Sequence, residues 1–311
     1  MDAPLFRPPD TFLGLPAGLP GRGRHVGVLG VPFDCGIHPF RVGAREGPAA
    51  VRRESQLIRR YHPLIGDADA PALLGAVDCG DVALVPANPA EAFPRIEAAA
   101  RAILDAGAVP IGIGGDGTIS LPLMRAAGRK HPGLVALHID SHTDDYPADP
   151  EDRYNPTTQF TCAAEDGAID PALSWHAGIR GFTFRAGVVQ RSQALGFRVV
   201  PIEELLARGF AQTVAEFGDA AGGRPVYLCW DMDVFDPAVA PGVCTPAWGG
   251  LSAREGITLM RALAGLNIVA MDFNTVSPAQ DVGGMAAHLC AHMIAEAMLL
   301  LAGRRGLLAA T

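Results

Sequence analysis

The sequence of 311 residues has six cysteines, and no two of them are spaced as a Cys-x-x-Cys pair. This absence argues against a zinc knuckle and a dense disulfide framework, so a reduced, cytoplasmic compartment is expected. Basic residues are also in the minority, because 25 Lys and Arg stand against 33 Asp and Glu. Nucleic acids and anionic membranes are bound mainly through clustered Lys and Arg, so neither is expected as a partner.

The N-terminal residues lack a basic start followed by an apolar stretch, which argues against a secretory signal. Residues 1–24 are rich in Pro and Gly and are predicted to form an N-terminal arm, packed on a neighbouring subunit. Residues 25–311 are predicted to form a single domain. The chain is 49% apolar, and its length is sufficient for one large buried core.

The most apolar stretch, Met285 to Ala302, still carries His288, His292 and Glu296. These residues interrupt it too often for a membrane span, so the stretch is predicted to be a buried terminal helix. Because the helix has almost no polar face, another subunit is expected to cover part of it. His288 and His292 are four residues apart, as metal ligands can be, but core or interface histidines are the preferred interpretation.

Short apolar runs alternate with helical patterns along the chain, which is typical of a parallel sheet wrapped by helices. The predicted fold is a three-layer α/β/α domain around a central, mainly parallel sheet of eight strands. Helices are expected over Pro89–Ala106 and over Ser252–Leu263, where Ser252 and Glu255 predict a capping box. The strand candidates are His25–Gly30, Leu73–Val77, Val109–Gly114, Leu134–Asp140, His176–Arg180, Phe197–Ile202, Val226–Asp231 and Asn267–Asp272.

Acidic motifs follow two of these strand candidates. One strand runs into Asp140-x-His142-x-Asp144, and another ends in Asp231-x-Asp233. Alternation in an extended segment points such side chains the same way, and parallel sheets bind ligands at the carboxyl ends of their strands. A cation is the simplest way to keep clustered carboxylates ionised, and oxygen with imidazole donors suits Mn²⁺, with Ni²⁺, Fe²⁺ or Zn²⁺ as alternatives. The bland alternative is that these acids are solvated loop residues or helix caps.

With these motifs the sequence resembles the ureohydrolase family, which includes arginases, agmatinases and guanidinobutyrases. The resemblance runs in order from about residue 25 to residue 300. Besides the two acidic motifs it rests on Val31-Pro32-Phe33-Asp34, Arg41–Pro48, Ala240–Pro246, Gly249–Leu251, Gly178-Ile179-Arg180-Gly181, Val276-Ser277-Pro278 and Asp281.

The family resemblance implies a pair of Mn²⁺-type ions that activate a bridging water to attack a guanidinium carbon and release urea. It assigns Asp140 and Asp231 to bridge the two metals, His142 and Asp233 to complete one site, and Asp144 to the other.

Three positions depart from the family pattern. Gly117 stands where the Gly-Gly-Asp-His motif has a metal-binding His, and it has no side-chain donor. Pro156 aligns with the His that shuttles protons in the family, and proline can do neither half of that task. Thr275 replaces the Glu that grips the guanidinium, and a neutral hydroxyl forms no charge-assisted pair. The sequence therefore predicts at most one Mn²⁺ or Ni²⁺ ion in this chain's own site, and no catalytic residue is assigned.

Three functions remain open. The preferred one is a non-catalytic subunit that joins an intact ureohydrolase paralogue in a trimer or hexamer acting on a small guanidino or biguanide substrate. In this the chain resembles the degenerate-site subunit of two-subunit metformin hydrolases. The alternative is an active single-chain amidine hydrolase with a rebuilt site, similar to agmatinase or guanidinobutyrase. The third is a binding protein that senses a guanidino ligand.

One further motif has a competing interpretation. Gly112, Gly114 and Gly117 also spell the Gly-x-Gly-x-x-Gly of dinucleotide-binding loops. This interpretation is disfavoured, because the glycines coincide with the metal loop of the resemblance.

Overall fold

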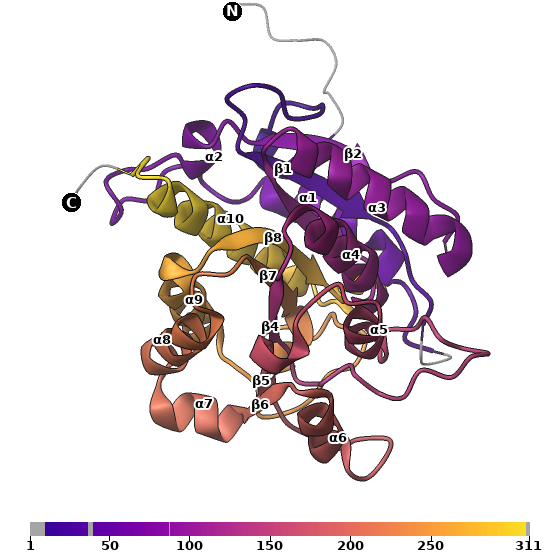
Figure 1. Ribbon diagram of the computed structural model, residues 1–311. Helices are drawn as coiled ribbons and strands as arrows, with labels where there is room; N and C mark the ends of the chain where they lie inside the picture. The colour runs from indigo at the N-terminus through magenta and orange to yellow at the C-terminus, as the bar shows by residue number, and fades with distance from the viewer. Residues whose placement is uncertain (1–9, 37–39, 87, 309–311) are drawn as a thin grey trace, which may run out of the picture.

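The computed structural model describes residues 10–36, 40–86 and 88–308. Within these ranges one eight-stranded sheet runs through the molecule in the order β2-β1-β3-β8-β7-β4-β5-β6, and each neighbouring pair is parallel (Figure 1). This confirms the predicted α/β fold with its eight-stranded sheet, and the sheet is wholly rather than mainly parallel. The strands are β1 Val26–Val31, β2 Val77–Asp81, β3 Val109–Gly114, β4 Val135–Ile139, β5 Trp175–Ile179, β6 Arg198–Pro201, β7 Val226–Asp231 and β8 Ile268–Asn274.

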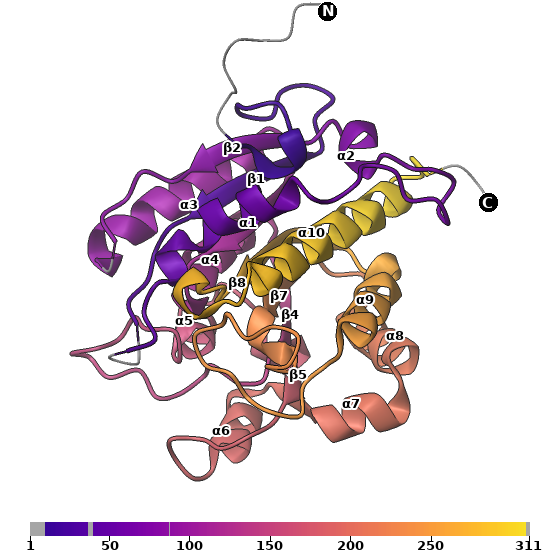
Figure 2. The same ribbon diagram turned by 180° about the vertical axis from the view of Figure 1, so that it is seen from behind.

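Helices cover both faces of the sheet and form a separate hydrophobic core on each (Figures 1 and 2). One core gathers side chains from the N-terminal segment and from six helices: α1 Gly47–Ser55, α2 Ala70–Leu73, α7 Ile202–Arg208, α8 Phe210–Ala221, α9 Ala253–Ala262 and α10 Met285–Arg304. The other gathers α3 Pro89–Asp105, α4 Ser120–Lys130, α5 Gln159–Glu165 and Leu195 of α6 Val188–Leu195.

The strands are buried on both faces, as the apolar runs in the sequence indicate. Val26 and Val28 of β1 point into the first core, whereas Leu29 and Val31 of the same strand point into the second. Successive side chains of a strand alternate between faces, so a strand covered on both sides must be apolar at nearly every position.

The terminal helix α10 is long and apolar enough to cross a membrane by length and composition, but most of it is buried inside this fold. It packs against α1, α2 and α9, as Figure 2 shows. Its buried Glu296 is satisfied by Arg261 of α9, whose guanidinium nitrogens lie 2.6 and 2.8 Å from the carboxylate oxygens. The prediction of a buried terminal helix is confirmed, and its coverage by another subunit stays a prediction.

One predicted strand is misplaced. Leu73–Val77 was expected to be extended, but Leu73 ends α2 and the strand β2 begins at Val77. The carboxylate of Asp69 accepts a hydrogen bond from the backbone N–H of Ala72, and Pro71 lies in the first turn. An N-cap followed by proline favours a helical turn, and this local signal outweighs the apolar run after it.

Part of the segment predicted as an N-terminal arm packs against its own chain. Residues 1–9 lie outside the described part, but Phe12, Leu13 and Leu15 are buried in the first core. The backbone N–H of Phe12 donates to the Asp78 carboxylate over 2.7 Å. These described residues therefore contribute to the stability of the domain itself.

A buried polar cluster lies inside the sheet around Asp272 of β8. Its carboxylate accepts hydrogen bonds from Tyr227, Asn274 and Ser120, and its side chain is fully buried. Burial raises the pKa of Asp272 to about 6, although these three hydrogen bonds pull it down. The cluster should therefore make the stability of the fold depend on pH.

We expect Asp272→Asn to flatten that pH dependence. An unfolded Asp titrates near 3.8, so between this pH and about 6 the folded chain holds the additional proton. The contribution of Asp272 to stability is then present at low pH and falls as the pH rises through this window. The native chain should lose roughly 3 kcal/mol of unfolding free energy through Asp272 as the pH rises from 4 to 8, and the variant should not show this loss. Denaturant unfolding of both proteins at pH 4 and pH 8 measures this difference, and Asp219→Asn, at an exposed position, serves as control. If the stability of the Asp272→Asn variant changes with pH in parallel with that of the native chain, the prediction is wrong.

Candidate metal centre

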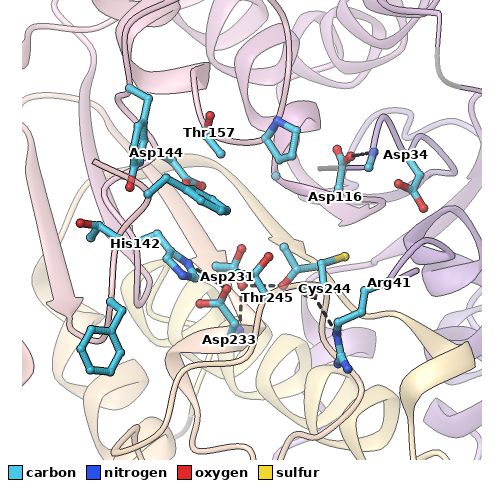
Figure 3. A pocket seen from close by; sticks show the side chains of 18 residues that line it. Asp34, Arg41, Asp116, His142, Asp144, Thr157, Asp231, Asp233, Cys244 and Thr245 are labelled. Carbon is cyan, nitrogen blue, oxygen red and sulfur yellow. Dashed lines mark hydrogen bonds and ion pairs between the residues drawn. The ribbon is translucent and has the colours of Figure 1, made fainter. Parts of the chain in front are cut away.

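The acidic motifs converge at the carboxyl ends of β4 and β7, beside the loop that follows β3. They border a cavity of about 260 Å³ (Figure 3). The cavity brings together four of the five predicted ligands and all three departing positions, while Asp140 lies buried beside His142. The lining residues are Asp34, Gly36, Arg41, Asp116, Gly117, His142, Asp144, Tyr146, Pro156, Thr157, Phe182, Thr183, Phe184, Asp231, Asp233, Cys244, Thr245 and Thr275.

One group of donors has the composition of a single cation site. Asp140, His142 and Asp233 each place a ligand atom within 4.8 Å of those of the other two. The His142 Nδ1 atom lies 3.1 Å from Asp233 Oδ2 and 3.3 Å from Asp140 Oδ1. Figure 3 shows His142, Asp231 and Asp233 facing one another across this end of the cavity. An imidazole with two carboxylates suits a divalent transition-metal ion, so this group fits one such ion.

A second group, His138, Asp140 and Asp144, also satisfies the distance requirement for a metal. However, the His138 Nε2 atom lies 2.7 Å from Asp140 Oδ2, and its Nδ1 lies 2.9 Å from the Nδ1 of His176. Despite the short distance between them, neither His138 Nε2 nor Asp140 Oδ2 forms a hydrogen bond among the described residues. His138 and Asp140 do not border the cavity, whereas His142 and Asp233 do, so the first group is the more accessible of the two to an ion. The sequence analysis did not single out His138. The sequence did contain a signal for it, because side chains two residues apart in a strand point the same way, so His138 lies on the same side of β4 as Asp140.

Electrostatics divide the acids of the site. Burial raises the pKa of Asp140, but the facing His138 and His142 outweigh it and hold this pKa well below its ordinary value. Burial and the nearby Asp233 and Asp140 raise the pKa of Asp231 well above its ordinary value. Burial, with Asp140 as the leading charge, does the same for Asp144. A cation among them would relieve this repulsion.

Two site residues have left-handed backbone conformations, which residues other than glycine rarely adopt. Asp144 has φ of 49° and the β-branched Thr275 has φ of 66°. Such left-handed conformations cost about 1–3 kcal/mol each and persist only where the surroundings enforce them. The N–H of Thr275 donates to the carbonyl of Gly115, and its own carbonyl accepts from the N–H of Cys244. The loops around the cavity are thus held in a defined, strained shape.

The three departing positions all border the cavity, and the structure shows what each one offers. The Thr275 hydroxyl donates to the Asp231 carboxylate and brings no charge to the cavity. Pro156 belongs to a tight turn in which Asn155 Oδ1 accepts from the N–H of Thr157, and its ring has no proton to give. At Gly117 a neighbour fills part of the space, because the carboxamide of Gln159 reaches Asp144 there. Sequence reasoning missed Gln159.

A family model of the arginase family matches residues 24–300. This chain belongs to the arginase family. The match spans the stretch over which the ureohydrolase motifs were found, so the family resemblance and the fold expected from it are confirmed.

Several arginase-family relatives are similar over nearly their whole length. Guanidinopropionase from Pseudomonas aeruginosa is 38% identical over 97% of this chain and 94% of that protein. The mitochondrial agmatinase of Gallus gallus is 34% identical over 94% of this chain and 86% of that protein. The solved structure of proclavaminate amidinohydrolase from Streptomyces clavuligerus superposes with a TM-score of 0.90 at 35% identity. It covers 97% of this chain and 100% of that one.

The structure supports one metal-binding group at this site. Asp140, His142 and Asp233 form a donor group that fits one divalent ion, and such an ion lowers the pKa of a water bound to it. The chain is thus an arginase-family protein with a cluster able to bind metal. The altered second position, with Gly117 in place of a metal-binding His, stays a prediction.

Proposed function

We propose that this chain is the metal-binding, non-hydrolytic subunit of a heteromeric amidino hydrolase, and that an intact ureohydrolase paralogue carries the turnover. The observation that carries the proposal is the meeting of Gly117, Pro156 and Thr275 at one cavity. At that cavity the chain has no imidazole at 117, no proton carrier at 156 and no charge at 275. Each loss removes a different requirement of guanidinium hydrolysis, so a single-chain enzyme would have to replace all three.

The substrate class proposed for the complex is a small guanidino or biguanide compound of the metformin type, cleaved at a C–N bond. The names of the relatives support this class, since they include guanidinopropionase and agmatinase. The ion proposed for this chain is a single Mn²⁺ or Ni²⁺ held by Asp140, His142 and Asp233. The proposed compartment is the cytoplasm, and it is supported by the six cysteines, all of which the structure describes and which are free thiols.

Assembly is supported by the mouth of the cavity. Phe182 and Phe184 line it, yet Phe182 is fully exposed and Phe184 is 67% exposed. Large exposed aromatic side chains are typical of protein interfaces, because they bury much apolar surface when a partner covers them. We therefore propose that the paralogue packs near this mouth in a trimer- or hexamer-type assembly.

Coexpression tests the proposed function. Purified alone, the chain should release no urea from guanidino or biguanide substrates, whether Mn²⁺ or Ni²⁺ is added. Expressed with each intact ureohydrolase paralogue of the same genome, it should copurify with one of them as a single larger species that is active.

The control for this experiment is the same complex in which the paralogue lacks a bridging aspartate, and it should be inactive. Turnover by the isolated native chain at ordinary enzyme rates, about 1–10³ per second, would contradict the proposal.

The second candidate is an active single-chain amidine hydrolase of the agmatinase or guanidinobutyrase type with a rebuilt site. The donor group Asp140, His142 and Asp233 favours it, because this group is complete and adjoins an open cavity. A neutral or bulky amidine would not require the charge that Thr275 lacks. Urea release by the isolated chain from such a substrate would select this candidate over the first.

A further inference from the structure

The carboxamide of Gln159 lies at the second metal position. Gln159 is the first residue of α5 and is only 1% exposed. Its Nε2 atom donates to Asp144 Oδ2 over 2.8 Å. Its Oε1 atom is buried and has no hydrogen-bond partner among the residues that the structure describes. Burying an amide with one hydrogen-bonding atom unpaired is costly. The structure must therefore contain a feature that favours the placement of Gln159 against Asp144.

The neighbouring Gly117 supplies that feature. A Cβ atom added at Gly117 would lie 2.8 Å from Gln159 Nε2, closer than real Cβ contacts allow, and 3.5 Å from Asp144 Oδ2. A side chain at 117 would therefore point at Asp144 along the path that the Gln159 amide occupies. Such a side chain would have to displace the end of the Gln159 side chain, and this displacement would break its hydrogen bond to Asp144.

The electrostatics of the amide match those of a cation. Asp144 is buried and faces the charges of Asp140 and Asp233. The amide N–H presents a positive hydrogen to the oxygen Oδ2, and a hydrogen bond to a charged group contributes about 1.5–3 kcal/mol. A cation approaching the same oxygen would be repelled by that hydrogen.

We propose that Gln159 takes the place of the second cation and closes this position, so that the chain binds one ion only, at Asp140, His142 and Asp233. The inference concerns the ions of this chain alone and holds whether or not it assembles with a paralogue. It has a specific consequence: in Gly117→His the Gln159 amide still competes with a second cation for Asp144, so full binding of that cation requires the removal of the amide as well.

Manganese binding to the purified full-length chain tests this inference. The proteins are the native chain, Gly117→His, Gln159→Ala, the double variant, and Gln212→Ala as a control on an exposed helix face. Each is loaded with Mn²⁺, desalted, and analysed for metal per chain and by electron paramagnetic resonance. The native chain, both single variants and the control should bind one ion with the signal of an isolated Mn²⁺. The double variant should bind two ions with the signal of a coupled pair.

Two results would overturn the inference. If the native chain holds a coupled pair and Gln159→Ala loses one ion, Gln159 is a ligand and not a replacement. If Gly117→His alone gains the second ion as fully as the double variant, Gln159 does not close the position. Copurification with a paralogue is a separate measurement, so the proposed function can fail while this inference stands.

The variant Gln159→Glu keeps the test decisive if the double variant does not fold. It sets a carboxylate against Asp144, and like charges at this distance destabilise the fold unless a cation lies between them. Added Mn²⁺ should therefore raise its melting temperature by several degrees more than that of the native chain. Equal shifts of the melting temperature for the two proteins would contradict the inference. The native chain, with its amide on Asp144, would then respond to Mn²⁺ at this position in the same way as the variant with a carboxylate there.

Discussion

A variant with Gly117→His, Gln159→Ala, Pro156→His and Thr275→Glu is expected to hydrolyse guanidino compounds as an isolated chain, with urea release at least ~100-fold above the background measured with the native chain. The first two changes open the second metal position and give it an imidazole. The third returns a group that carries protons, a contribution of roughly 10²–10⁴-fold in enzymes. The fourth returns a carboxylate able to pair with a guanidinium.

The backbone of the site favours this restoration. Thr275 already has φ of 66°, which is unfavourable for a β-branched residue, and glutamate is not β-branched. Asp231, which now accepts a hydrogen bond from the Thr275 hydroxyl, becomes free to contact a metal. The cavity of about 260 Å³ has room for a small substrate beside these groups.

Urea release measures the gain, with 3-guanidinopropionate, 4-guanidinobutyrate and agmatine as substrates and Mn²⁺ in excess. The matched control adds Asp231→Asn to the same four changes and should return the rate to that of the native chain. If the fourfold variant folds and holds two ions but gives no turnover, these positions do not explain the inactivity proposed for the chain.

Replacing Arg52 by Met should lower the free energy of unfolding by about 3–5 kcal/mol. The Arg52 side chain is buried in α1 and forms two hydrogen bonds, 2.8 and 3.0 Å long, with the buried carboxylate of Asp78. Burial lowers the pKa of Arg52, but Asp78 and Asp81 outweigh this and raise it above its ordinary value. Without the guanidinium, Asp78 would keep a buried charge with no cation beside it. Asp78 also receives the N–H of Phe12, so the loss should loosen the N-terminal segment.

Denaturant unfolding measures this loss, and Arg53→Met is the matched control. Arg53 is the next residue of the same helix, but its side chain is 64% exposed, and within the described part of the chain it pairs with its neighbour Glu54. Exposed ion pairs contribute little, so the control should change stability by about 0.5 kcal/mol or less. Equal effects of the two substitutions would show that the buried pair does not stabilise the fold.

The fold and the location of the site were predictable from local patterns. Apolar runs such as Val109–Gly114 and Val226–Asp231 appear in the structure with the bounds that the sequence indicated. The carboxyl ends of parallel strands lie at one edge of a sheet. For this reason Asp140 and His142, which follow β4, lie near Asp231 at the end of β7. The departures at Gly117, Pro156 and Thr275 were equally visible, since a missing donor is a property of the residue type. The one misplaced strand, Leu73–Val77, failed where a capped turn competes with an apolar run.

What the sequence could not determine depends on contacts between distant segments. Gln159 contacts Asp144 at a sequence separation of 15, and Ser120 of α4 contacts Asp272 of β8 at a sequence separation of 152. His138 meets His176 because β4 and β5 pair in a register that places these two residues opposite each other. Periodicity records which face of a strand or helix is buried, so the sequence alone specified the layers, the sheet and the acidic motifs at its edge. Strand order and helix packing select each side chain's neighbours, so only the tertiary structure showed that the Gln159 amide contacts the buried carboxylate of Asp144.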